Sequence, residues 1–197
     1  MNISVIIAFL FLTIPAFATP GPNNLMLMAS GAKFGLRRTL PHAVGINIGF
    51  PLMVFVLGLG LAEVFGAYPQ IKIVMKYLAA GYFLWMAWNL LGLKIGQQGG
   101  AARPMKFIEA VLFQWVNPKA WAMAVSFIAA FASTGEASLS SLVLITIGCM
   151  FIGPFFSFFW VIFGKQLHIL LVRTKAEKFL GAILATLMLV AVVLFLI

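Results

Sequence analysis

Apolar residues fill most of this chain in long runs, and short polar stretches separate the runs. A helix needs about 20 mostly apolar residues to cross the hydrocarbon core of a bilayer. The pattern predicts six such spans, with expected ranges 3–29, 42–61, 71–93, 107–132, 142–164 and 179–197. The sequence therefore predicts an all-α integral membrane protein with six transmembrane helices.

The first span contains the segment Thr-Pro-Gly-Pro-Asn-Asn at 19–24. Its two prolines remove backbone donors and clash with the preceding turn, and the glycine between them permits unusual backbone angles. In hydrocarbon, an unpaired backbone N–H or C=O group costs several kcal/mol. We therefore expect the helix to stop there, to restart after Pro22, and to line a protected cavity.

The two halves of the chain resemble each other. Span 107–132 is also interrupted, at 114–119, where Gln-Trp-Val-Asn-Pro-Lys again places proline beside asparagine. Because each half has three spans, the second half must enter the membrane from the opposite side. This predicts one transmembrane domain, 1–197, made of two inverted-topology three-helix repeats (1–96 and 107–197) with helices 1 and 4 broken. The alternative is that each proline is only a packing kink.

Composition and charge support a membrane location. Hydrophobic residues make up 63% of the chain and charged residues 9%, whereas a soluble domain is nearer half apolar and a quarter charged. The net charge is +9, but Lys and Arg are scattered through the connectors 30–41, 94–106 and 165–178, which favours lipid anchoring over nucleic-acid binding. Positive connectors face the cytoplasm, so connector 97–106 is expected to be cytoplasmic and both termini periplasmic.

The first break offers chemistry for an anion. If a helix restarts after Pro22, the free N–H groups of Asn23, Asn24 and Leu25 point into the gap, where a substrate carboxylate would fit. Thr19, Asn23 and Asn24 add hydroxyl and amide groups that both donate and accept hydrogen bonds. The alternative is that these side chains cap the half-helices.

The second break contains Lys119, a basic residue predicted to lie deep in a span. A buried ammonium is costly and usually functional, although a lysine can also extend toward a membrane interface. Gln114 and Asn117 would supply neutral hydrogen bonds beside it. Asn47, in span 42–61, faces the same choice between interhelical bonding and substrate contact.

Other chemistry is sparse. The sequence has no Asp, and its four Glu residues lie near span ends, so a carboxylate site for sodium or protons at the midplane is not expected. Glu109 follows Lys106 by three residues, a spacing that suits an ion pair. His42 and His168 are expected at span edges, and a lone Cys149 forms no internal disulfide. Because no catalytic triad, metal-ligand cluster or phosphate loop is present, we expect neither an enzyme nor a cofactor.

These motifs resemble the LysE/RhtB family of bacterial amino-acid exporters. The resemblance rests on the segments 19–24 and 117–120, on Gly35 and Gly45, and on the length and the six spans. It implies export from the bacterial cytoplasm across the inner membrane, driven by the proton-motive force. Asn23-Asn24 and the segment 114–117 look closest to the cysteine and O-acetylserine branch, whereas Ala110 stands where many members carry glycine.

The sequence thus predicts an inner-membrane exporter of small neutral amino acids or derivatives, such as cysteine and O-acetylserine or threonine and homoserine. Its partners would be that substrate and the lipid bilayer, and association into a homo-oligomer is left open. The alternatives are a non-transporting membrane subunit and a channel-like pathway. The expected substrate-binding residues are Thr19, Pro20, Gly21, Pro22, Asn23, Asn24, Asn47, Gln114, Asn117, Pro118 and Lys119.

Overall fold

The computed structural model describes residues 3–61, 103–132 and 138–174, with isolated positions between 81 and 91 and between 176 and 190. This part of the chain is helical and contains no strand. Two of its segments, Pro22–Gly60 and Leu139–Arg173, are long and apolar enough to cross a membrane. The predicted spans 71–93 and 179–197 lie mostly outside the described residues.

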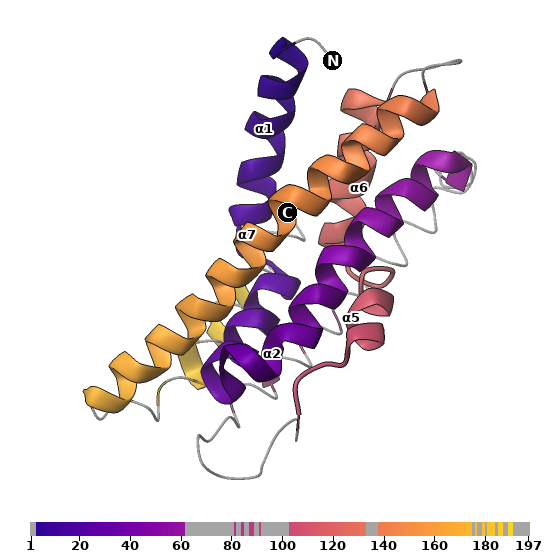
Figure 1. The fold of residues 1–197 in the computed structure, drawn as a ribbon. Helices are drawn as coiled ribbons and strands as arrows, with labels where there is room; N and C mark the ends of the chain where they lie inside the picture. The colour runs from indigo at the N-terminus through magenta and orange to yellow at the C-terminus, as the bar shows by residue number, and fades with distance from the viewer. Residues whose placement is uncertain are drawn as a thin grey trace.

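The first helix breaks where the prolines predict. Helix α1, Ile3–Ala18, ends just before the Pro-Gly-Pro segment, and helix α2, Pro22–Val56, begins with its last proline (Figure 1). Gly21 is the N-cap of α2, and proline at the first helical position is favourable because its missing N–H would be unpaired anyway. The predicted break is therefore confirmed.

A sharp turn divides α2 at Gly35. The backbone there has φ 75° and ψ 174°, a conformation that is almost confined to glycine. Figure 1 shows the α2 ribbon turning back at the lower end of the molecule. The prediction of a connector over 30–41 was wrong in extent, because residues on both sides of Gly35 are helical and one glycine makes the turn. After α2, the π-helical turn η1, Leu57–Leu61, completes the second span.

The second break is also confirmed. Helix α5, Phe107–Phe113, and helix α6, Pro118–Phe131, are separated by a turn at 114–116. In Figure 1 the chain runs down from α1 into the first arm of α2 but up from α5 into α6. The two broken segments therefore run in opposite directions, as an inverted repeat requires, although the full repeat stays a prediction.

Helix α7, Ser138–Arg173, is longer than the predicted span 142–164. It continues into the expected connector 165–178, so Lys165 and Arg173 are helical. Helix α2 packs chiefly against α7 and α5. Close packing depends on small residues: a Cβ atom added at Gly49 would lie 2.7 Å from Cα of Val111 in α5.

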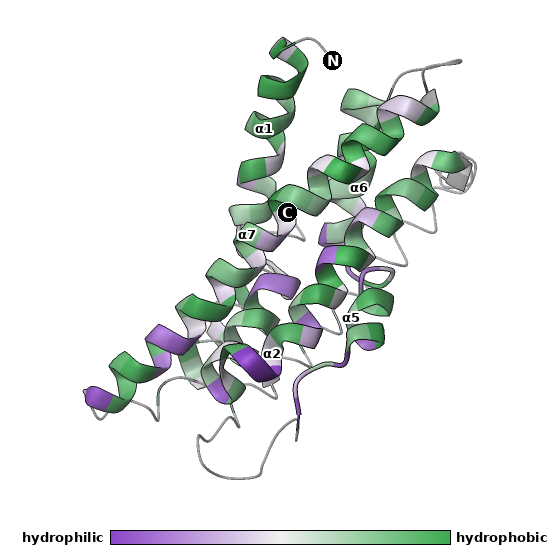
Figure 2. Cartoon of the chain, viewed as in Figure 1, coloured by the Kyte–Doolittle hydropathy of each residue, from purple (hydrophilic) through white to green (hydrophobic). Residues whose placement is uncertain are grey.

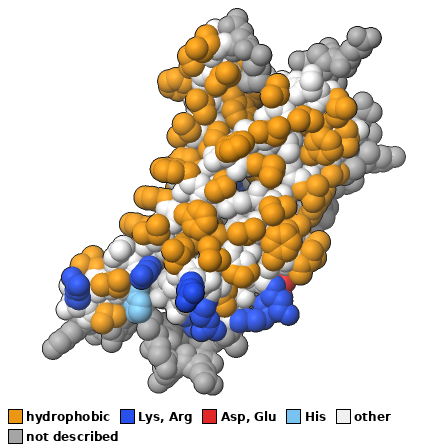
Figure 3. All heavy atoms as spheres, in the orientation of Figure 1, with side chains coloured by type: hydrophobic (Ala, Val, Ile, Leu, Met, Phe, Trp, Pro, Cys, Tyr) orange, Lys and Arg blue, Asp and Glu red, His pale blue; other side chains and the backbone are white. Residues whose placement is uncertain are grey.

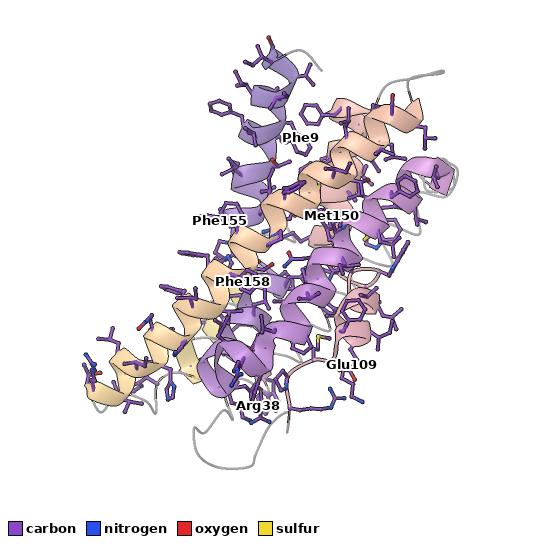
Figure 4. All side chains as sticks on the ribbon, viewed as in Figure 1. Phe9, Arg38, Glu109, Met150, Phe155 and Phe158 are labelled. Atoms are coloured by element: carbon purple, nitrogen blue, oxygen red, sulfur yellow. The ribbon has the colours of Figure 1, made fainter. Side chains whose placement is uncertain are left out.

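The surface of the described residues is apolar except at one end. Apolar residues cover most of the length of the helices (Figure 2), and Figure 3 shows Lys and Arg side chains gathered at one end. Figure 4 places Arg38 and Glu109 at that end, whereas α1 begins at the other. Along α7, Phe151 and Phe155 are 80% and 72% exposed, as lipid-facing residues would be. This distribution is that of a membrane-spanning bundle.

Candidate substrate-binding site

A cavity lies where the two helix breaks meet. About 510 Å³ of space lies between the side chains there, a volume that includes open space at the mouth of the cavity. Six of the residues that the sequence singled out line it, namely Gly21, Asn23, Asn24, Asn47, Asn117 and Lys119. Residues from the two breaks, which are far apart in the sequence, therefore share one site.

A pair of amide side chains joins the two breaks. Asn23 Nδ2 donates to Gln114 Oε1 at 2.8 Å, and Gln114 Nε2 donates back to Asn23 Oδ1 at 3.3 Å. Gln114 Nε2 also donates to the carbonyl of Ala110 at 2.9 Å, which satisfies an acceptor near the end of α5. Gln114 is fully buried and does not line the cavity, so its role is to hold the breaks together.

Lys119 makes a second connection between the breaks. Its Nζ donates to the carbonyl oxygen of Thr19 at 2.5 Å, across 100 residues of sequence. Its aliphatic chain lies against Gly21, where an added Cβ atom would be 2.5 Å from Lys119 Cδ. The ammonium thus occupies a backbone acceptor that the first break exposes.

Two helix N-termini face this cavity. No side chain caps α2, so the N–H groups of Asn23 and Asn24 stay available. The expectation for Leu25 was wrong, because its N–H donates to the carbonyl of Gly21 at 2.9 Å and so closes the first helical turn. In α6, Asn117 Oδ1 accepts from the N–H of Lys119 at 3.1 Å, which leaves the N–H of Ala120 without a partner among the described residues.

The capping alternative holds for part of the site. Asn24 Nδ2 donates to the carbonyls of Phe17 and Thr19, both at 2.9 Å, and so caps the end of α1. The hydroxyl of Thr19 donates to the carbonyl of Pro15. Asn117 caps the N-terminus of α6 by accepting from the N–H of Lys119, yet both Asn24 and Asn117 also line the cavity. Capping therefore does not exclude contact with a ligand.

The remaining predicted site residues shape the breaks without lining the cavity. Thr19, Pro20, Pro22 and Pro118 are absent from its wall. The prolines end and restart the helices, and Thr19 contributes its carbonyl to Lys119. The sequence located the two breaks correctly but did not separate the residues that form the wall from those that form the frame.

Sequence reasoning missed one wall of the cavity, which belongs to α7. Cys149, Gly153 and Ser157 line it at intervals of four residues, so they share one helix face. Ser157 Oγ donates to Asn47 Oδ1 at 3.0 Å. Asn47 therefore bonds between helices and also lines the cavity, while its contact with a substrate stays a prediction. The available signal was this run of small or polar residues inside a Phe-rich helix.

The predicted ion pair of Glu109 forms with a different partner. Glu109 pairs with Arg103, its oxygens 2.6 and 2.8 Å from the guanidinium nitrogens, rather than with the side chain of Lys106. The three-residue spacing reflects a cap, because Glu109 accepts from the backbone N–H of Lys106 at 2.8 Å. The hydrogen bond to Glu109 raises the pKa of Arg103 above its ordinary value. His42 is buried, only 2% exposed, and its expected place at a span edge stays a prediction.

The described residues suggest a transport site rather than a metal centre. Within them, no group of three His, Cys, Asp or Glu residues is placed to hold a metal ion. A family model described as LysE type translocator matches residues 14–197, which include both breaks and the cavity. The chain belongs to the LysE family. It is therefore a membrane transporter and not an enzyme, as the sequence motifs predicted.

Relatives of this LysE-family chain are similar along most of its length. The cysteine/O-acetylserine efflux protein of Escherichia coli strain K12 is 26% identical over 183 residues, which cover 87% of this chain and 93% of the relative. The protein of the same name from Shigella flexneri is 27% identical over 176 residues, covering 83% and 90%. No solved structure matches the chain.

Proposed function

We propose that this LysE-family transporter exports small neutral amino acids or their derivatives, cysteine and O-acetylserine foremost, across the bacterial inner membrane, driven by the proton-motive force. The observation that supports this most directly is the charge of the cavity. Two helix N-termini and Lys119 face it, and the described residues that line it include no Asp or Glu. Such a site favours a carboxylate.

The charge of the cavity also favours a substrate with a neutral side chain over one with a cationic side chain. Every amino acid brings a carboxylate, which the helix N-termini and Lys119 would bind. A cationic side chain such as that of lysine would need a negative counter-charge, and the part of the cavity wall that the structure describes supplies none. A neutral side chain has no such requirement. It would pack against the aromatic part of the wall, where Phe17 stacks on Phe156 at 6.4 Å between ring centroids.

Lys119 offers a way for the substrate to change the site. In the structure its ammonium binds the carbonyl of Thr19. An arriving zwitterion carries a carboxylate that attracts Lys119 and an ammonium that can replace it at that carbonyl. The exchange would replace the bond between Lys119 and Thr19 with two charge-assisted hydrogen bonds to the substrate, while it releases one of the two direct connections between the breaks. We propose that this release accompanies the change of access.

The orientation of the chain in the membrane is part of the proposal. We propose that the basic end is cytoplasmic, that both termini are periplasmic, and that the two three-helix halves rock about the cavity between the breaks. The opposite directions of the two broken segments support this arrangement (Figure 1). The names of the relatives support cysteine and O-acetylserine, and threonine and homoserine are the nearest alternatives of similar size.

The test is efflux from proteoliposomes loaded with cysteine, O-acetylserine, threonine, homoserine, leucine or lysine, with and without an uncoupler under an imposed proton gradient. We expect export of the small neutral substrates, none of lysine, and loss of gradient-driven export with the uncoupler. Export of lysine at a similar rate would contradict the charge argument. An efflux rate that the uncoupler does not change would favour a channel. No efflux from folded protein would favour a non-transporting subunit.

A further inference from the structure

The cavity has two chemically different ends. One end is formed by the breaks, where Gly21, Asn24, Asn117 and Lys119 gather polar groups and helix N-termini. The other end lies between α2 and α7, where Asn47 meets Gly153 and Ser157. If the first end binds the charged groups that all amino acids share, the second is left for the part in which they differ.

Gly153 leaves space in the wall at this second end. A Cβ atom added there would lie 3.0 Å from Asn47 Oδ1 and 3.5 Å from Phe17 Cε1. Both neighbours line the cavity, so the missing side chain corresponds to space at the cavity wall rather than to helix packing. A single methyl group at this position would press on Asn47 and reduce the room for a substrate side chain.

Asn47 at this end has hydrogen-bonding capacity to spare. Its Oδ1 accepts from Ser157 Oγ, which fixes the orientation of the carboxamide, and its Nδ2 has no partner among the described residues. Asn117 is similar, because it is only 2% exposed and its Oδ1 accepts from the N–H of Lys119, while its Nδ2 donates to no described residue. Two unpaired amide donors at a cavity wall call for acceptor atoms on a ligand.

We propose that the face of α7 formed by Cys149, Gly153 and Ser157, together with Asn47, is the subsite for the substrate side chain, and that Gly153 sets the largest side chain it admits. This proposal rests on the proposed export of neutral amino acids. The subsite takes a short side chain with an oxygen or sulfur acceptor, such as a thiol, hydroxyl or acetyl ester. Asn47 Nδ2 donates to that atom, and Ser157 holds Asn47 in position.

The test compares two substrates that differ in side-chain size. Initial efflux rates of cysteine and O-acetylserine are measured in proteoliposomes containing the wild-type protein or Gly153→Ala. Because one methyl group in a pocket changes selectivity by about tenfold or more, we expect the rate for O-acetylserine to fall about tenfold relative to that for cysteine. An unchanged ratio in folded Gly153→Ala protein would overturn the proposal.

Gly148→Ala is the matched control. It adds the same methyl group to the same helix, but against the ring of Phe9 and outside the cavity wall. It should change both rates by the same factor. Cys149→Ala should have the opposite effect to Gly153→Ala. It removes the sulfur atom from the wall, so the rate for O-acetylserine should rise relative to that for cysteine.

The outcomes separate the two proposals. If the wild-type protein exports neither substrate, the proposed function fails and the subsite fails with it. If the wild-type protein exports both substrates, but Gly153→Ala and Cys149→Ala leave their ratio unchanged, only the subsite assignment fails. Opposite shifts of the ratio in these two variants, with none in Gly148→Ala, would support the subsite.

Discussion

The residues at the two breaks serve the backbone and the cavity at once. A membrane helix that stops at proline exposes carbonyl and N–H groups, and the side chains beside the prolines satisfy most of them. Asn24 and Lys119 share the carbonyl of Thr19, and Asn117 takes an N–H of α6. The N–H groups of Asn23, Asn24 and Ala120 have no partner among the described residues, and all three residues line the cavity. Polar residues at the breaks thus stabilise the fold, and we propose that a ligand completes the hydrogen bonding.

The amide pair between Asn23 and Gln114 should couple the two breaks energetically. In a cycle of Asn23→Ala, Gln114→Ala and the double variant, we expect a coupling free energy of roughly 0.6 to 1.7 kcal/mol, the range for interhelical hydrogen bonds in membranes. Unfolding in mixed micelles measures it. The pair Asn24→Ala and Gln114→Ala, which shares no bond, is the control and should be additive. Additivity in the first cycle would contradict the connection.

At the residue scale, the sequence predicted those parts of the site whose residue types are unusual in membrane helices. Proline, asparagine and lysine are rare inside apolar spans, so 19–24 and 114–119 stand out without a structure. Cys149, Gly153 and Ser157 do not stand out, because small residues are common in membrane helices and only packing decides which of them face a cavity. The pairing of Glu109 with Arg103 was missed for a related reason, since Arg103 lies outside the helix whose spacing was considered.

At the scale of elements, the prolines predicted both helix breaks, but the sharpest turn was missed. A connector of twelve residues was expected at 30–41, where a single glycine turns the chain between two helical arms. The charges of Lys33, Arg37 and Arg38 suggested a loop, but exposed charges are compatible with helix at a membrane surface. Hydropathy reports where a chain meets lipid headgroups and does not report whether it is helical there.

The turn at Gly35 gives a prediction for stability. Gly35→Ala should destabilise the protein by about 1 to 3 kcal/mol, because a residue with a Cβ atom is strained at φ 75° and ψ 174°. Nothing lies within 4 Å of an added Cβ atom, so the cost would come from the backbone and not from a clash. Thermal unfolding in detergent measures it, with the exposed Leu40→Ala as control. Equal stability of the two variants would show that the turn tolerates side chains.

At the scale of the whole molecule, basic residues mark one end, and the two helix breaks lie between the two ends. The basic end lies at the Gly35 turn, and α1 begins at the opposite end (Figures 1 and 3). Between the two ends, the surface is apolar and the breaks meet across the bundle. The family membership agrees with this design, since a translocator needs a central site that two halves can expose in turn.

The orientation of the molecule is directly testable. Cys149 is the chain's single cysteine, so a Cys149→Ala background lets one introduced cysteine report its side of the membrane. With a membrane-impermeant maleimide, we expect Arg37→Cys to be labelled only from the cytoplasmic side and Ile3→Cys only from the periplasmic side. Labelling of both from one side would contradict the arrangement of α1 and α2. A reversed pattern would contradict the positive-inside assignment.

The most direct test of the central claim, that the two breaks form one substrate site, is substrate efflux by Lys119→Met in proteoliposomes. Methionine keeps the length of the side chain and removes the charge, so export should fall roughly ten- to a hundredfold, as loss of a hydrogen bond to a charged group predicts. Lys106→Met, which removes an exposed charge at the basic end, should export at the wild-type rate. Wild-type export by folded Lys119→Met protein would contradict the account.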